Sequence, residues 1–186
     1  MNAGRLIARV AIGGLFVGHG TQKLFGWFGG SGPEGTARMM EKLELHPGRR
    51  NALASGISET TGGALLALGA LTPLAAAMLS GTMFTAIRKV HLPKGIWNTN
   101  GGYEYNLSLI AALAALVDGG PGAPSVDSAL GIDTTGSRWA LASIAAGAAG
   151  AALAIGAGRT EAEHGTEAQP EPQEGEPQQP PLSAAA

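Results

Sequence analysis

The chain has 186 residues, of which 45% are hydrophobic and only 14% are charged. Soluble globular domains carry about 25% charged residues, so this composition argues against an ordinary soluble domain. Cysteine is absent, which excludes disulfide frameworks, thiol catalysis, thiolate zinc sites and cysteine-held iron–sulfur clusters. The sequence contains neither the phosphate-binding pattern G-x-x-x-x-G-K-[ST] nor the zinc-binding pattern H-E-x-x-H, and we expect no metal site.

The charges divide the chain into two parts. Residues 1–159 hold all 12 Lys and Arg residues and 8 of the 14 acidic residues, which leaves a net charge of +4, and residues 160–186 hold the other 6 acidic residues. Neither part is charged strongly enough to indicate a nucleic-acid partner, and we expect none. The stretch 160–186 is rich in Glu, Pro and Gln and cannot bury an apolar core, so it is predicted to be a disordered tail.

Five stretches have the length and composition of membrane helices, which need about 20 mainly apolar residues. They are residues 6–25, 51–69, 72–90, 103–117 and 138–157. Surface helices of a soluble bundle would show a polar stripe, but residues 64–71, 73–87 and 140–157 carry no charge on any face. We therefore predict an all-α integral membrane protein in a lipid bilayer. Residues 1–130 would form a four-helix bundle core and residues 131–159 an additional C-terminal transmembrane helix.

Three local features refine this interpretation of the spans. Arg5 and Arg9 precede the first apolar run as in a signal peptide, but no A-x-A cleavage site follows, so a retained helix is predicted. Gly69 and Pro73 enclose a short connection that predicts a tight antiparallel hairpin, the alternative being one long helix kinked at the proline. Residues 34–45 predict a short helix, lying either on the membrane surface or in a solvated loop.

Basic residues predict the orientation of the spans. With five spans, the loops 26–51 and 88–103 and the C-terminal tail lie on one side, which holds 9 of the 12 basic residues. The positive-inside rule makes this side cytoplasmic, so we expect the N-terminus outside and the C-terminus inside. Four of the five Trp and Tyr residues fall near the same side, as expected for an aromatic belt at a membrane interface.

Polar side chains within the spans are costly to place in lipid and are candidates for function. His19, Gln22 and Lys23 share one face of the first predicted helix, because they are spaced i, i+3 and i+4. Glu59 lies about 12 Å into the second predicted helix, on the face that also carries Ser55. A glutamate at that depth is expected to be protonated or paired, and His19 and Lys23 are the closest candidates in depth.

The same half of the membrane holds three more polar side chains. Arg88 lies near the end of the third predicted span, and Glu104 and Asn106 lie in the first turn of the fourth, so that Arg88 could pair with Glu104. The candidate intramembrane polar site therefore comprises His19, Gln22, Lys23, Glu59, Arg88, Glu104 and Asn106. A structural interpretation is also open, in which ion pairs and helix caps at a membrane boundary only hold the helices together.

Five sequence blocks resemble the DoxX family. They are 13–30 (GGLFVGHGTQKLFGWFGG), 59–63 (ETTGG), 68–73 (LGALTP), 101–106 (GGYEYN) and 120–127 (GPGAPSVD), which stand in the family's order within residues 5–130. The family-typical residues at these positions are His19, Gly20, Lys23, Glu59, Gly62, Gly63, Gly102, Glu104 and Asn106. The predicted fifth helix and the acidic tail depart from the family's pattern.

The resemblance implies a small bacterial inner-membrane protein with a four-helix core and an association with redox chemistry. Relatives include a subunit linked to quinone reduction during thiosulfate oxidation, and members proposed to assemble with superoxide dismutase and a sulfurtransferase. The cofactor stays open, and quinone is one that the resemblance allows.

Two hypotheses of function follow. In the first, the chain is a quinone-interacting subunit of an oxidoreductase complex, with His19, Lys23 and Glu59 at the quinone head group and with Arg88 and Glu104 at the mouth of the site. In the second, the chain is a non-catalytic membrane scaffold that docks redox or stress-response partners, or further copies of itself. A solute transporter is less favoured, because the segments show no inverted repeat with broken helices.

Overall fold

The computed structural model describes residues 3–167, and it describes side chains up to residue 158. Within this range the chain is all-helical and contains no strand, which confirms the predicted all-α class. The helices are α1 (Ala3–Phe25), η1 (Trp27–Gly29), α2 (Gly32–Lys42), α3 (Gly48–Leu68), α4 (Thr72–Ala86), η2 (Ile87–His91), η3 (Leu92–Lys94), η4 (Asn98–Asn100), α5 (Glu104–Gly119), α6 (Val126–Ala129) and α7 (Ser137–Glu167).

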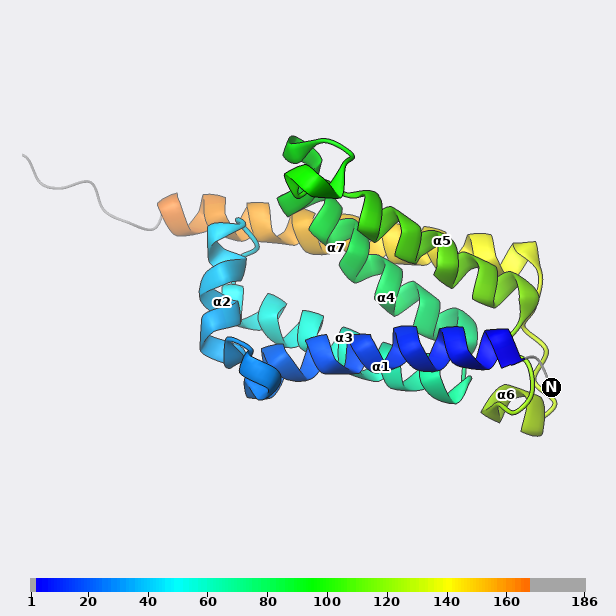
Figure 1. Ribbon diagram of the computed structural model, residues 1–186. Coiled ribbons are helices and arrows are strands. Elements are labelled where there is room, and N and C mark those ends of the chain that lie inside the picture. Colours follow the sequence, from blue (N-terminus) through cyan, green and yellow to red (C-terminus); the bar gives the residue numbers. More distant parts are fainter. Residues whose placement is uncertain (1–2, 168–186) are drawn as a thin grey trace, which may run out of the picture.

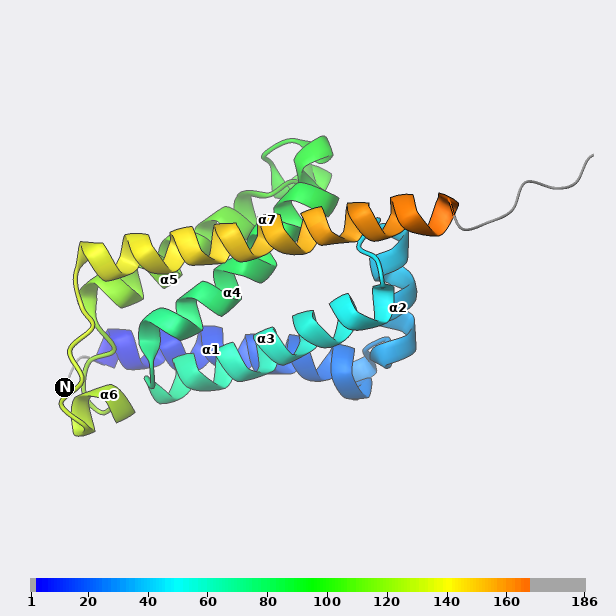
Figure 2. The ribbon, with the colours of Figure 1, turned by 180° about the vertical axis from the view of Figure 1, so that it is seen from behind.

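The long helices form two layers (Figure 1). α1 and α3 lie side by side in one layer, and α4 packs against α5 and α7 in the other. Figure 2 shows the same arrangement from behind, with α2 standing across one end and joining the two layers. The core between them is fully apolar at Leu66, Leu79, Leu113 and Val117, each of which has 0% of its surface exposed. Close packing of these side chains supplies many dispersion contacts between the layers.

Glycine residues allow α1 and α3 to approach each other closely. A Cβ atom on Gly13 would lie within 3.0 Å of the Gly63 carbonyl oxygen, and a Cβ on Gly63 would lie 2.6 Å from the carbonyl oxygen of Gly13. Gly20 meets Thr60 and Gly56 in the same way. Small residues at such crossings permit backbone contact between membrane helices.

The connection between α3 and α4 is the tight hairpin that the sequence predicts. Gly69 adopts a left-handed conformation with φ 63°, and the amide of Ala70 donates to the carbonyl oxygen of Leu65 at 2.9 Å. This is the hydrogen bonding of a glycine-terminated helix, and α4 begins immediately afterwards at Thr72, with Pro73 in its first turn. The alternative of one continuous helix kinked at Pro73 is therefore wrong.

The five predicted spans correspond to α1, α3, α4, α5 and α7, but they differ in how well they meet a membrane criterion. Among the described residues, one stretch is both long and apolar enough to cross a bilayer, Ser137–Gly158 in α7, and only 22% of it is buried. α4 and α5 have just 15 and 16 residues, whereas a straight span needs about 20. The four-helix core with a fifth span thus stays a prediction, and helical structure alone is confirmed.

Two further predictions concern the segments outside these helices. The short helix predicted at residues 34–45 is present as α2, Gly32–Lys42. The tail predicted to be disordered from residue 160 begins differently, because α7 continues to Glu167. Alanine and glutamate at 161–163 favour helix. The prediction of a disordered tail rested on the composition of residues 160–186 as a whole and did not consider these first residues separately. Residues 168–186 lie outside the described part of the chain.

Candidate functional site

A cavity of about 480 Å³ lies between the two layers at the end that α2 covers. Its walls come from α2, α3, α4, η2 and α7, together with one residue of α1. Most of the lining is apolar, including Met39, Met40, Met78, Met83 and Ala151. Its size falls within the roughly 300–1,000 Å³ range typical of small-molecule sites.

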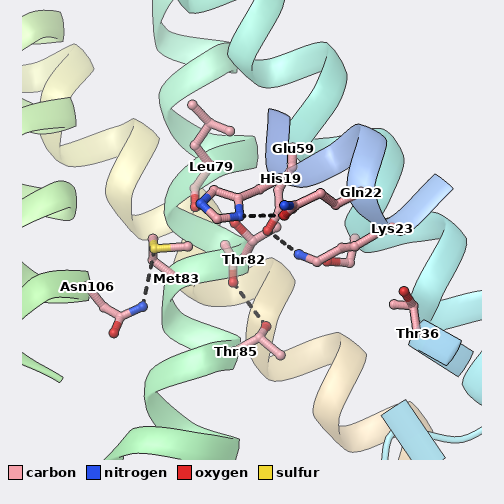
Figure 3. Close-up of polar contacts among 12 residues, drawn as sticks. His19, Gln22, Lys23, Thr36, Glu59, Leu79, Thr82, Met83, Thr85 and Asn106 are labelled. Carbon is pink, nitrogen blue, oxygen red and sulfur yellow. Dashed lines mark hydrogen bonds and ion pairs between the residues drawn. The ribbon is translucent and has the colours of Figure 1, made fainter. Parts of the chain in front are cut away.

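The polar part of the cavity wall is an ion pair between α1 and α3. Lys23 Nζ lies 2.5 Å from Glu59 Oε1, and it also donates to Ser55 Oγ at 3.1 Å. Figure 3 shows the lysine ammonium group pointing at the glutamate carboxylate. The Glu59 side chain is only 5% exposed and that of Lys23 is 23% exposed. The predicted pairing of Glu59 is therefore confirmed, with Lys23 as the partner.

The local sequence explains why these two groups meet. Lys23 stands in the last turn of α1, and Gly20 one turn earlier brings the α1 backbone against α3. Ser55 and Glu59 are spaced i and i+4 on α3, so they share the face that Lys23 reaches. The lysine stem is long enough to cross the remaining gap and keep its charge at the carboxylate.

The second oxygen of the Glu59 carboxylate has no hydrogen-bond partner within residues 3–158. In the described part of the chain, Glu59 Oε2 is buried and has no hydrogen-bond partner, and the same holds for Thr60 Oγ1. A buried polar atom without a partner costs about 1–3 kcal/mol. A group that supplied a hydrogen bond to Glu59 from the cavity side would therefore be stabilised there.

His19 and Gln22 do not join the ion pair. His19 Nδ1 lies 3.1 Å from Gln22 Oε1 and the histidine is exposed on the outer surface of α1. The i, i+3 spacing correctly brings these two side chains together. Of the three residues on this predicted face, however, only Lys23 lines the cavity, and neither His19 nor Gln22 does.

Asn106 touches the cavity wall indirectly. Its side-chain nitrogen lies 3.3 Å from the sulfur of Met83, a residue of the wall, and the asparagine is buried on α5. Figure 3 shows this contact between α5 and α4. Asn106 thus positions Met83 rather than facing the cavity itself.

Arg88 and Glu104 are not paired, contrary to what their sequence positions suggest. Glu104 Oε1 accepts a hydrogen bond of 2.9 Å from the backbone amide of Asn98, so it fixes the loop before α5. Arg88 lies instead beside a second, smaller cleft that it shares with Lys42, Glu44 and Lys89. Arg88 stands in a turn of π-helix, Ile87–His91, in place of regular α-helix.

A second polar network, which the sequence analysis did not identify, closes the opposite end of the molecule. Asp127 is 1% exposed and accepts hydrogen bonds from Leu71 N at 2.8 Å, from Thr72 N at 3.1 Å and from Thr72 Oγ1 at 2.8 Å. Arg9, 2% exposed, donates to the carbonyl oxygen of Pro124 and interacts electrostatically with Asp127. The sequence did contain one indication, because Arg9 is the charged residue within the predicted spans that lies apart from the others, which gather in the opposite half of the predicted membrane.

The arrangement can hold an amphiphilic molecule. Its apolar body would contact the methionines and alanines, and a carbonyl or hydroxyl group would meet the ammonium of Lys23 and the free oxygen of Glu59. Among the described residues no group of three or more His, Asp or Glu side chains could hold a metal ion.

Comparison with known proteins gives one match. The model of the DoxX family matches residues 4–92, which hold α1 to η2 and therefore both members of the ion pair. The later blocks at 101–106 and 120–127 lie outside the matched range. No curated protein and no solved structure matches the chain. The match over residues 4–92 supports membership of the DoxX family, and with it an association of the chain with a membrane.

Proposed function

We propose that this protein binds a quinone in the cavity between its two helix layers, as a quinone-interacting subunit of membrane redox chemistry. The single observation that carries the proposal is the combination of an apolar cavity of about 480 Å³ with one buried, incompletely satisfied ion pair in its wall. Small-molecule sites are commonly apolar with a few convergent polar groups.

The residues present fit the chemistry of a quinone. A quinone ring carries carbonyl oxygens that accept hydrogen bonds, and Lys23 supplies an ammonium donor at the cavity wall. When bound, the quinone supplies reversible uptake of electrons and protons. Glu59 lines the cavity, and its Oε2 has no hydrogen-bond partner among the described residues, so this carboxylate is the group of the chain that would exchange a proton with a bound ring.

The membrane setting supports the same proposal. Quinones are lipid-soluble, so a site for a quinone is expected among helices that lie in the bilayer. We propose that α1, α3, α4, α5 and α7 embed in a bacterial inner membrane, as a DoxX-like domain followed by one additional helix. The basic loops 26–51 and 88–103 would lie in the cytoplasm and the N-terminus outside.

The test is the quinone content of the purified protein. The full chain is isolated in a mild detergent, extracted with organic solvent and assayed for quinone against protein concentration. We expect close to equimolar quinone in the wild type and a marked loss in Glu59→Gln, which keeps the side-chain shape but removes the charge. Glu41→Gln, an exposed change on α2, is the matched control and should retain the quinone. A folded wild type without quinone, or an unaffected Glu59→Gln, contradicts the proposal.

A second function, a non-catalytic scaffold, is favoured by one observation. Lys23 bonds both Glu59 and Ser55, so the ion pair also joins α1 to α3 in the manner of a structural lock. The scaffold hypothesis expects Glu59→Gln to destabilise the fold and to change no chemistry. It also expects deletion of residues 160–186 to remove a co-purifying redox partner, which a pull-down from the native membrane measures.

A further inference from the structure

A second cleft, of about 280 Å³, lies beside the main cavity and differs from it in chemistry. It is lined by Lys42, Leu43, Glu44, Arg88, Lys89 and Ile155. Four of these six residues carry charge, whereas most of the main cavity's lining is uncharged. The cleft therefore needs a different ligand from the cavity.

The charges of this cleft leave a positive surplus. Lys89 Nζ lies 3.2 Å from Glu44 Oε2, which is the one ion pair of the cleft. Within residues 3–158, neither Lys42 nor Arg88 forms an ion pair. Two cations thus face the cleft beyond the one that Glu44 neutralises, and two such groups can bind a phosphate with charge-assisted hydrogen bonds.

The backbone helps to bring these cations together. The five residues of η2 form a π-helical turn, and two neighbours in it, Arg88 and Lys89, both line the cleft. Consecutive side chains of a regular α-helix diverge by about 100°. Turns of π-helix are rare and occur frequently at functional sites.

The position of the cleft along α7 indicates the depth at which it lies. The candidate membrane span of α7 ends at Gly158, and Ile155 of the cleft stands three residues earlier, about 4.5 Å along the helix axis. The neighbouring Leu153 is 75% exposed and faces away from the protein core. With α7 embedded as proposed above, the cleft lies at the boundary between the hydrocarbon layer and the head groups, where lipid phosphates lie.

We propose that this cleft binds the phosphate group of an anionic membrane lipid through Lys42, Arg88 and Lys89. Basic pockets between helices at the membrane boundary recognise acidic head groups in this way. Free phosphate offers the same chemistry, but the apolar Leu43 and Ile155 beside the cations favour a ligand with an acyl chain. The proposal does not depend on a quinone in the main cavity, because the two sites share only Leu43 and Lys89.

The test compares three probes on the full chain in detergent, namely dihexanoyl phosphatidylglycerol, dihexanoyl phosphatidylcholine and inorganic phosphate, by isothermal titration calorimetry. We expect phosphatidylglycerol to bind at least about tenfold more tightly than phosphatidylcholine, since several basic groups attract the anionic head group. Inorganic phosphate should bind more weakly than phosphatidylglycerol. Equal affinity for the two lipids overturns the proposal, and so does inorganic phosphate binding as tightly as phosphatidylglycerol, which would indicate a site for the free ion.

Variants locate the binding in the cleft. Lys42→Gln with Arg88→Gln should weaken phosphatidylglycerol binding about 25-fold, at about fivefold per charge removed. Arg38→Gln with Arg49→Gln removes two exposed charges from the same predicted side of the membrane and should leave the affinity unchanged. Glu44→Gln should instead strengthen binding about fivefold, because it removes the opposing carboxylate.

The direction in which Glu44→Gln changes the affinity for phosphatidylglycerol distinguishes a loss of binding groups from a folding defect. Loss of structure weakens binding in every variant, whereas the proposal requires opposite changes for Glu44→Gln and Arg88→Gln. Helical content measured by circular dichroism shows whether each variant is folded. If the double variant does not fold, the single variants Glu44→Gln and Arg88→Gln decide the matter. The proposal is overturned if phosphatidylglycerol affinity changes in the same direction in both of these variants, or changes in neither.

Discussion

The ammonium group of Lys23 lies 2.5 Å from Oε1 of Glu59, and Oε2 of the same carboxylate is buried without a hydrogen-bond partner among the described residues. The pair joins α1 to α3 and at the same time forms the polar part of a cavity wall. Its structural contribution can be tested by removing the charges, and the proposed binding can be tested separately by filling the open space of the cavity beside them.

The structural contribution of the pair predicts an asymmetric mutant cycle. Lys23→Met leaves the buried carboxylate without its partner and should lower the free energy of unfolding by about 3 kcal/mol. Lys23→Met combined with Glu59→Leu removes both charges and should lie within about 1 kcal/mol of the wild type, because apolar replacements fit a buried site. Unfolding in detergent, followed by circular dichroism during titration with a denaturing detergent, measures both values.

A charge of the same kind at an exposed position is the control for this cycle. Lys94→Met removes a basic side chain that the structure leaves exposed, and its effect should be small. If Lys23→Met lowers the free energy of unfolding no more than Lys94→Met does, the ion pair contributes little to stability. The interpretation that it holds α1 against α3 is then wrong.

Open space in the cavity predicts a variant that blocks binding without harming the fold. Gly150 lines the cavity, and a Cβ atom added there would meet no atom within 4 Å. Gly150→Leu should therefore fill the cavity and remove most of the bound quinone. Replacing a helical glycine should also raise the free energy of unfolding by about 0.5–1 kcal/mol.

Gly156→Leu is the matched control, because it lies on the same helix, has equally open surroundings and does not line the cavity. It should give the same gain in stability with the quinone retained. Solvent extraction and the unfolding assay report the two quantities. Retention of quinone in Gly150→Leu would place the ligand elsewhere.

The ion pair shows what the sequence could predict. Depth along a helix follows from counting residues at 1.5 Å each, and the cost of a lone charge in lipid requires a partner. These two arguments lead from Glu59 to His19 or Lys23 as its partner without any knowledge of the fold, and the structure selects Lys23. The i, i+3 contact of His19 with Gln22 follows from helix geometry in the same way.

The cavity and the Arg9–Asp127 network could not be predicted by these means. The cavity depends on how α7 and α2 lie against α3 and α4, which no helical spacing encodes. Arg9 and Asp127 are separated by most of the chain, and they meet only because α6 folds back over the α3–α4 turn. The expected pairing of Arg88 with Glu104 is wrong, because Glu104 accepts from the backbone amide of Asn98 and Arg88 stands in a π-helical turn that helical spacing does not predict.

Close contact between α1 and α3 predicts a steep dependence on side-chain size at the glycines of the crossing. In Gly13→Ala the new Cβ would collide with the backbone of α3, which cannot move as a flexible side chain can. We expect a loss of about 1–3 kcal/mol from this overpacking. Gly14→Ala is the control on the same turn, since a Cβ there meets nothing within 4 Å.

The control variant Gly14→Ala separates the effect of packing from the general effect of replacing a helical glycine. Gly14→Ala should be neutral or stabilise the protein by about 0.5–1 kcal/mol, because alanine restricts the unfolded chain. The difference between the two variants in the unfolding assay then measures the packing of the crossing alone. Equal stabilities would show that α1 and α3 are further apart than the structure places them.

The network at the opposite end predicts that Asp127 acts as an external cap of α4. The side chain accepts from the amides of Leu71 and Thr72, and the electropositive start of a helix favours a carboxylate there. Asp127→Asn keeps the shape but loses the charge and half of the acceptor capacity. We expect a loss of about 2–4 kcal/mol, because buried amides and the buried guanidinium of Arg9 are left poorly satisfied.

Asp133→Asn is the control in the same loop. Hydrogen bonds from the Thr135 hydroxyl and amide hold the pKa of Asp133 below its usual range, but this carboxylate lies at the surface. A lowered pKa means that its small contribution is present at neutral pH and is lost as the pH falls through the acidic range. Asp133→Asn should therefore cost far less than Asp127→Asn at pH 7. Equal losses for the two variants at neutral pH would show that burial of Asp127 does not determine the stability of this end of the molecule.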